Sequence, residues 1–461
     1  MDKKVDISNQ MANAPVWSLI IKLSIPAILA QIVNLLYNIV DRIYIGHMED
    51  VGTMAITGVG LCFPIISLIT AFTMFVAQGG APRAAIEMGK GDIKKAEKIL
   101  GNCFLLLILL SVILTFVFLA FGERLLMLFG ASESTIIYAL PYMNIYVAGS
   151  VFVMISLGLN MFITTQGFTK ISMATVLIGA ICNIILDPIF IFGFDLGVRG
   201  AAFATIISQA VSAVWVLSFL LGKKTKIGIK KENFLPSIRI LAPVLALGIS
   251  PFVMSATEAV INVAFNSSLQ KYGGDIAVGA MTICTTIFQM VWVPAQGIGQ
   301  GAQPIISYNY GAKNGNRVKQ AFKAFLTICF SYVFVFGMAI ELFPQFFIKI
   351  FNDNPELMET ATWTIRLYGC ALVFFGIQMA VQQTFIALGK AKASLFIACL
   401  RKVILLVPLI YILPNFFENK VFAVFLAEPV SDAISIITAS VVFFFVFRKE
   451  MKNLKAENQL K

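Results

Sequence analysis

The sequence predicts an all-α membrane protein, and three observations support this fold class. Of the 461 residues, 59% are hydrophobic and only 13% are charged, with a mean hydropathy of +0.87. Soluble globular chains carry about 45–50% apolar and about 25% charged residues. Long apolar runs fill nearly the whole chain, and its basic residues gather in the short gaps between them. A soluble chain and a disordered chain are therefore both excluded.

Twelve apolar runs reach the length of roughly 20 residues that a membrane-spanning helix needs. Helices are expected because hydrocarbon offers the backbone no hydrogen-bond partner outside its own segment. The chain also lacks the short alternating segments of a β-barrel. The predicted spans are 17–44, 53–78, 99–122, 136–164, 172–194, 200–221, 240–268, 276–300, 321–349, 359–388, 393–414 and 420–447.

The basic residues predict the orientation in the membrane. If the N-terminus is cytoplasmic and the helices alternate, 25 of the 35 Lys and Arg residues fall on the cytoplasmic side and 6 on the other. This is a strong positive-inside pattern. We expect a multi-pass protein of the cytoplasmic (inner) membrane of a bacterium, with both termini in the cytoplasm and membrane lipids around it. The net charge of +11 is then a topology signal and needs no nucleic-acid partner.

The second half of the chain repeats the first. Matching residues in the two halves are separated by nearly the same number of positions as Gln78 and Gln300. Gln78-Gly79, Pro82 and Gly89 in the first half match Gln300-Gly301, Pro304 and Gly311 in the second, and further pairs follow in the same order. An even number of helices in each half means that both halves cross the membrane in the same direction, so the repeat is parallel. We expect two six-helix lobes related by a pseudo-twofold axis along the membrane normal, with a V-shaped central cleft.

The repeat also sets the predicted domain boundaries. Residues 1–222 form an N-terminal lobe with helices 1–6, and residues 223–239 form a basic cytoplasmic linker. Residues 240–461 form a C-terminal lobe with helices 7–12 and a basic cytoplasmic tail. Two facing lobes of this kind are typical of a carrier that opens alternately to each side of the membrane.

Carboxylates inside apolar helices are costly, so the few that occur here are candidate functional residues. Asp41 ends a long apolar run, although Arg42 beside it leaves a surface ion pair open as an alternative. Asn183 and Asp187 are four residues apart, on one helical face. Pro188 removes a backbone donor and frees a carbonyl nearby, which is also compatible with a purely structural kink. These hard oxygen donors suit Na⁺ or a proton.

The second half carries a further set of candidates. Glu258 lies near the middle of helix 7 and has no cationic neighbour in the sequence. Glu428 and Asp432 are four residues apart in helix 12 and, with Arg401 and Lys402 of helix 11, fit a structural charge cluster. The candidates for binding substrate or carrying a proton are Glu258, Tyr37, Gln289, Trp292, Gln378 and Gln382. The two glutamines of helix 10 could instead bond between helices.

These features together resemble the multidrug and toxic compound extrusion (MATE) transporters, in particular their bacterial MepA-like and DinF-like branches. The resemblance covers residues 15–447 and includes Pro26 near the start of helix 1 and the Asn-x-x-x-Asp-Pro run at 183–188. It implies a cation-coupling site in the N-terminal lobe. The five positions that match the family pattern are Asp41, Asn160, Asn183, Asp187 and Thr205. Asp41, Asn183 and Asp187 would then hold Na⁺ or a proton.

The resemblance implies an antiporter and not an enzyme. Entry of H⁺ or Na⁺ would drive export of amphipathic, often cationic compounds by alternating access, giving multidrug resistance. No cofactor besides the coupling ion and no catalytic residue is expected, and with both lobes in one chain a monomer can work. Glu258 matches the glutamate of another branch, but helix 10 has no carboxylate after Glu359 to complete that site. The alternative function is a flippase for a lipid-linked saccharide or another lipid, for which the helices hold few arginines.

Overall fold

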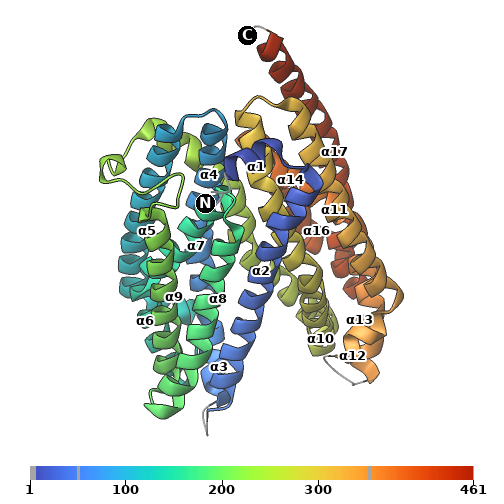
Figure 1. The fold of residues 1–461 in the computed structure, drawn as a ribbon. Coiled ribbons are helices and arrows are strands. Elements are labelled where there is room, and N and C mark those ends of the chain that lie inside the picture. The colour runs from blue at the N-terminus through green and yellow to red at the C-terminus, as the bar shows by residue number, and fades with distance from the viewer. Residues whose placement is uncertain (1–6, 49–51, 351–354, 460–461) are drawn as a thin grey trace. The chain divides into compact units, whose positions relative to one another are not determined.

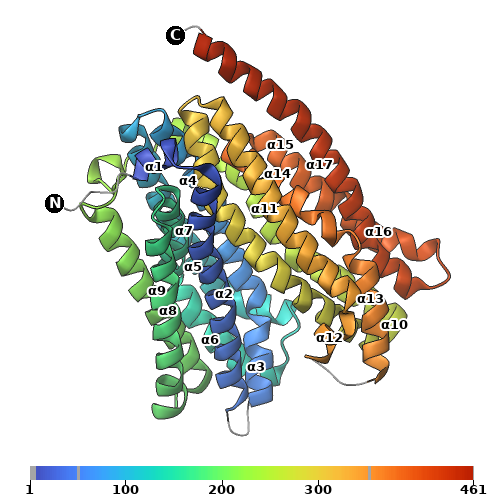
Figure 2. The same cartoon turned by 45° about the vertical axis from the view of Figure 1, so that its right-hand side comes forward.

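The computed structural model describes residues 7–48, 52–350 and 355–459, and nearly all of them are helical (Figures 1 and 2). The first half contains α1 (Ile7–Asn13), α2 (Val16–Gly46), α3 (Gly52–Leu61), α4 (Phe63–Gly89), α5 (Ile93–Leu128), α6 (Glu133–Ala148), α7 (Ser150–Thr165), α8 (Thr169–Pro188), the π-helical turn η1 (Ile189–Gly193) and α9 (Gly197–Leu221).

The second half begins after a short 3₁₀ turn, η2 (Lys231–Asn233). It contains α10 (Ile238–Gly311), α11 (Gly315–Leu342), α12 (Pro344–Lys349), α13 (Pro355–Gly369), α14 (Leu372–Ala387), α15 (Ala391–Cys399), the π-helix η3 (Leu400–Leu406), α16 (Val407–Ile412), the 3₁₀ turn η4 (Leu413–Asn415) and α17 (Lys420–Gln459).

The helices agree with the twelve predicted spans. Within the described ranges, nine helical segments are long and apolar enough to cross a membrane, and two bent pairs raise that number to eleven. The helix α10 contains both predicted spans 240–268 and 276–300, on either side of a break at Gly274. Gly274 has a φ of 64° and a ψ of −159°, a backbone conformation that is accessible almost only to glycine. The predicted all-α fold class is therefore confirmed.

The surfaces of these helices are apolar as well as their packed faces. In α5, only 22% of the most apolar 18-residue window is buried within the protein. Phe116 and Leu128 of α5 are 74% and 79% exposed. A surface of this kind is stable when hydrocarbon covers it, which is expected of a multi-pass membrane protein.

The predicted repeat recurs in the backbone at the offset that separates Gln78 from Gln300. At this offset, the end of α4 corresponds to the end of α10, and the end of α7 to the end of α14. The beginning of α5 likewise corresponds to that of α11, and the beginning of α8 to that of α15. Both halves also bend at one position, by 54° between α6 and α7 and by 42° between α13 and α14. Asp92 and its counterpart Asn314 each cap the following helix by accepting a backbone N–H. The two halves are thus copies of one helical plan.

Contacts divide the chain into two compact units. One contains Leu29–Gly248, and the other contains Met1–Ile28 together with Ile249–Lys461. The unit boundaries fall within α2 and α10, so each of these helices contributes residues to both units. The lobes 1–222 and 240–461 follow the repeat and remain a prediction.

The repeated Gln-Gly pair is explained by close helix packing inside each unit. A side chain at Gly79 would lie 2.2 Å from the backbone oxygen of Val244, at the start of α10. A side chain at Gly301 would lie 2.6 Å from the backbone nitrogen of Ser24, in α2. Each glycine therefore permits an approach that any larger residue would prevent.

The segment 223–239, predicted as a basic linker, is tied to the unit that contains residues 29–248. The Oε1 of Gln166 accepts three hydrogen bonds from residues 225–227, of 2.9, 2.7 and 3.1 Å. Lys230 forms an ion pair of 2.7 Å with Glu97. The hydrogen bond to this carboxylate raises the pKa of the Lys230 ammonium above its usual value. The segment is therefore a fixed part of this unit.

Candidate functional site

The C-terminal end of α8 positions the predicted cation-coupling residues. Asn183 and Asp187 lie one turn apart, and the Nδ2 of Asn183 donates to Asp187 Oδ1 at 3.1 Å. The same nitrogen donates to the hydroxyl of Thr205, in α9, at 3.4 Å. Pro188 ends the helix, and the wider π-helical turn η1 follows directly. The sequence-predicted set Asn183, Asp187 and Thr205 is thus brought together.

This group is buried but not fully hydrogen-bonded. Asp187 is 0% exposed and Asp41 is 9% exposed. Asp41 Oδ1, Asn183 Oδ1 and Asp187 Oδ2 have no hydrogen-bond partner within the described ranges of the chain. The charges of Asp41 and Asp187 are close enough to repel each other. Because a buried polar atom without a partner is costly, these oxygens are suited to accept a small cation or a proton.

The alternative of a surface ion pair for Asp41 does not hold in the structure. Arg42 is exposed whereas Asp41 is buried, and no ion pair joins these two described residues. Tyr37, one turn earlier on α2, interacts electrostatically with both Asp41 and Asp187. Tyr37 therefore lies near the acidic pair.

Asn160 forms no hydrogen bond with either carboxylate in the described chain, but it lines the same small cavity as Asn183, Thr205 and Tyr37. This cavity has a volume of about 40 Å³. The side chain of Asn160 donates to the backbone oxygen of Ser172 at 3.2 Å and accepts from Thr175 at 3.1 Å. The structure thus gives Asn160 partners other than Asp41 and Asp187.

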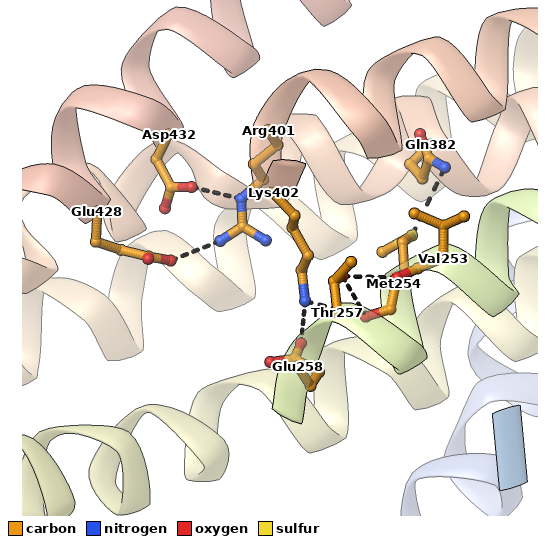
Figure 3. A network of polar contacts seen from close by, with 9 residues as sticks. All are labelled: Val253, Met254, Thr257, Glu258, Gln382, Arg401, Lys402, Glu428 and Asp432. Carbon is orange, nitrogen blue, oxygen red and sulfur yellow. Dashed lines mark hydrogen bonds and ion pairs between the residues drawn. The ribbon is translucent and has the colours of Figure 1, made fainter. Parts of the chain in front are cut away.

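The second unit holds the predicted charge cluster (Figure 3). Arg401 donates to Asp432 at 2.5 Å and to Glu428 at 2.9 Å. Its guanidinium also lies 4.5 Å from the centre of the Phe375 ring and 5.9 Å from that of Trp292. The three charged groups are buried. Arg401, Glu428 and Asp432 therefore meet as the sequence predicts.

Glu258 has a cationic partner that the sequence did not indicate. The ammonium of Lys402 binds the Glu258 carboxylate and also donates to the backbone oxygen of Met254 at 3.3 Å (Figure 3). The Lys402 side chain is 5% exposed, whereas that of Glu258 is 56% exposed. Lys402 follows Arg401 on η3, so this π-helix supplies both cations. Glu258 and Lys402 are 144 residues apart, which explains why local spacing gave no signal.

These charges line a cavity of about 340 Å³ together with aromatic side chains. Trp292 and Gln289, both predicted as substrate contacts, lie in its wall, as does Glu258. The rings of Phe288 and Tyr368 stack with their centres 5.3 Å apart. The cavity therefore combines a half-exposed carboxylate with a flat aromatic wall.

Gln378 and Gln382 are instead bonded between helices. Gln378 donates to Ser435 at 2.8 Å, and Gln382 donates to Ser250 at 2.8 Å and to the backbone oxygen of Ser394 at 3.1 Å. Gln382 is the repeat counterpart of Asn160, whose own bond to the backbone of Ser172 is the equivalent one. The repeat relates these two bonds, and this signal could have indicated the structural role of both side chains. Contact of Gln378 and Gln382 with substrate stays a prediction.

The comparisons with known proteins agree with these features. A family model described as MatE matches residues 26–189 and again residues 251–412. The chain belongs to the MatE family. The resemblance to MATE transporters is thus confirmed, and membership of this family indicates a transporter. The double match also follows the internal repeat.

Two curated relatives illustrate the similarity in sequence. The multidrug export protein MepA of Staphylococcus aureus (strain NCTC 8325 / PS 47) is 25% identical over 411 residues, which is 88% of each chain. The multidrug export protein MepA of Staphylococcus haemolyticus is 24% identical over 416 residues, covering 88% of this chain and 89% of the relative.

Solved structures match over almost the entire length. An outward-facing structure of a multidrug resistance MATE family transporter has a TM-score of 0.87, with 24% identity and 99% of each chain covered. A transporter from Pyrococcus furiosus has a TM-score of 0.88, with 23% identity, and the match covers 99% of this chain and 100% of that one. These matches confirm the MATE fold.

Proposed function

We propose that this transporter is a cation-coupled antiporter that exports amphipathic, often cationic compounds, with H⁺ or Na⁺ as the coupling ion. The observation that carries the proposal is the buried acidic pair Asp41 and Asp187, whose carboxylates each keep an oxygen without a partner in the described chain. The names of the staphylococcal relatives support the class of substrate, since they are multidrug export proteins. The protein would lie in the cytoplasmic membrane with both termini in the cytoplasm, working as a monomer.

The coupling ion would act by neutralising the acidic pair. An empty site leaves two buried negative charges near each other, and a bound cation or proton removes their repulsion. A ligand shifts a conformational equilibrium only by its difference in affinity for the two states. Inward movement of one charge across 100 mV supplies about 2.3 kcal/mol, which is enough to bias such an equilibrium.

The cavity of the second unit would contribute to substrate binding. The half-exposed carboxylate of Glu258 suits a cationic group, and the wall with Trp292 suits a flat apolar body. Gln289 would add a polar contact. The flippase alternative is not favoured, because the relatives are multidrug exporters and Arg401, which lines the cavity, is held by Glu428 and Asp432.

The test is efflux of ethidium, a fluorescent cation, from reconstituted vesicles driven by a Na⁺ gradient or by a pH gradient. We expect Asp41→Asn to reduce gradient-driven efflux at least about 100-fold, because the substitution removes a coupling charge worth several kcal/mol. Asp195→Asn is the matched control, since Asp195 is exposed in the same unit. Efflux at the wild-type rate in well-expressed Asp41→Asn would contradict the assignment. The gradient that drives the wild-type protein identifies the ion.

A further inference from the structure

A groove on the second unit has no part in the proposed transport cycle. It lies between α11, α14 and α17 and has a volume of about 550 Å³. It is separate from the cavity at Glu258 and shares no lining residue with it. The groove has an apolar floor and a basic rim, and these two parts occupy different levels along α17.

The floor is built from packed aromatic rings. Phe322 of α11 lies 4.4 Å from Phe443 and 5.3 Å from Phe447 of α17, measured between ring centres. Phe443 and Phe447 stack on each other at 4.8 Å. Phe444, which also lines the groove, is 57% exposed. The floor is therefore rigid and apolar, and it offers surface to a hydrocarbon chain.

The rim is cationic. Lys319 of α11 and Arg448, Lys452 and Lys455 of α17 line it, and no acidic side chain among those that the structure describes does so. None of these four forms an ion pair with another described residue. Arg448, Lys452 and Lys455 repeat every three to four residues, which places them on one helical face. The rim thus presents a concentrated positive charge that no described acidic side chain pairs with.

The carboxylate of Glu450, which lies between two rim residues in the sequence of α17, is used elsewhere. The carboxylate of Glu450 binds Lys390 at 2.7 Å and accepts the hydroxyl of Tyr310 at 2.7 Å. Glu450 does not line the groove. It therefore cannot neutralise the rim without giving up two partners.

The length of α17 places the rim at the level of lipid headgroups. Forty helical residues extend for about 60 Å, roughly twice the thickness of the hydrocarbon core. Figure 2 shows the C-terminal part of α17 continuing past the ends of α11 and α14. Phe443 and Phe447 of the floor belong to the apolar part of α17, and the rim on this helix begins with Arg448, where that part ends. Floor and rim thus match the acyl and headgroup levels of one leaflet.

We propose that this groove binds an anionic phospholipid. Its phosphate would lie among Lys319, Arg448, Lys452 and Lys455, and an acyl chain would lie on Phe322, Phe443 and Phe447. Clustered basic residues next to a membrane-spanning helix are suited to anionic headgroups. A soluble anion would use the rim but would leave the apolar floor uncovered. The charge and the two levels of the groove therefore favour a lipid over free phosphate.

The test is binding of phosphatidylglycerol to the delipidated full-length protein in detergent, measured by native mass spectrometry and by the shift in Tm. The test variant is Lys319→Gln/Lys452→Gln. The control is Lys323→Gln/Lys449→Gln. It also removes one lysine charge from α11 and one from α17, but at exposed positions outside the groove. Phosphatidylcholine, inorganic phosphate and glycerol phosphate are the comparison ligands.

We expect the test variant to bind phosphatidylglycerol about 30-fold more weakly than the wild-type protein, and the control to bind it within about 3-fold. Equal weakening in both variants would overturn the proposal, as would equal affinity for phosphatidylcholine. Stabilisation by inorganic phosphate alone, or a co-purifying protein lost only from the test variant, would also overturn it. If the test variant does not fold, Phe447→Ala with phosphatidylglycerol tests the floor separately. Because binding is measured without transport, its failure is independent of the proposed function.

Discussion

The two halves of the chain differ at equivalent positions of α8 and the α15–η3 segment, where one half has small side chains and the other has cations. Gly179 and Ala180 line the small cavity near Asn183, in the first half. At the repeat-related positions, the second half has Arg401 and Lys402, which line the larger charged cavity. One half therefore has small side chains next to carboxylates that form no ion pair among the described residues. The other half holds its carboxylates with cations that belong to the chain, although Glu428 also keeps one oxygen, Oε2, without a hydrogen-bond partner in the described chain.

This difference separates two kinds of buried acid. A carboxylate bound by a lysine or arginine is neutralised permanently, because the cation is attached to the backbone. Asp41 and Asp187 repel each other, and each keeps an oxygen without a partner in the described chain. A mobile cation or proton can therefore change the charge of Asp41 and Asp187, but not that of the carboxylates already bound by a lysine or arginine. The comparison predicts that the same sort of substitution changes stability in one half and ion response in the other.

The largest effect is expected when the cation of the charge cluster is removed. Arg401→Met leaves Glu428 and Asp432 buried without the guanidinium that binds both of them, which should lower the free energy of unfolding by about 3–5 kcal/mol. Denaturant titration in detergent measures this loss. Arg366→Met is the control, because Arg366 is exposed in the same unit. A similar loss of unfolding free energy in the two variants would contradict a special contribution of the charge cluster to stability.

A smaller and asymmetric effect is expected at the second pair. Glu258→Gln leaves the buried ammonium of Lys402 without its carboxylate, which should cost about 1–3 kcal/mol. Lys402→Met leaves Glu258 half-exposed and hydrated, so its cost should stay below about 1 kcal/mol. The same titration compares the two variants. A larger loss in Lys402→Met would show that packing of the lysine stem outweighs the ion pair.

The smallest effect on stability is expected at the acidic pair. Asp187→Asn removes a buried charge that has no cationic partner among the described residues, so in the absence of the coupling ion the free energy of unfolding should change by less than about 1 kcal/mol, or rise. The coupling ion at 100 times its Kd should stabilise the wild-type protein by about 2.7 kcal/mol, and the variant much less. Thermal unfolding with and without NaCl, at two pH values, measures both. A clear loss of stability without the ion, as large as that expected for Glu258→Gln, would make Asp187 a structural residue.

Most of the fold could be predicted because it depends on properties that are local in the sequence. Apolar length predicted the spans, and the Gln-Gly pairs at 78–79 and 300–301 revealed the repeat before its helix ends were seen. The bends after Ala148 and Gly369 were not predicted, because uninterrupted apolar runs give no signal of a change in helix direction.

The candidate site also contains features that could be predicted from local sequence and features that could not. Asn183 and Asp187 were placed together by helical periodicity, and Arg401, Glu428 and Asp432 by complementary charge. The pairing of Glu258 with Lys402 depends on how α10 packs against η3, and no spacing in the sequence contains that information. The bond of Asn160 to the Ser172 backbone was also missed, although the repeat relates it to the bond between Gln382 and the Ser394 backbone.

The fixed segment between the two repeats has a mechanical consequence. A free chain of this length would behave as a flexible tether with an end-to-end distance of about 23 Å. Here Gln166, at the C-terminal end of α7, and Glu97 hold the segment along its path, and Asn102 accepts the backbone N–H of Ser237 at 2.8 Å just before α10 begins. These bonds join the connection to α5 and to the end of α7 at several points. We therefore expect a shift at the start of α10 to displace α5 and α7 as well, more than a flexible tether would.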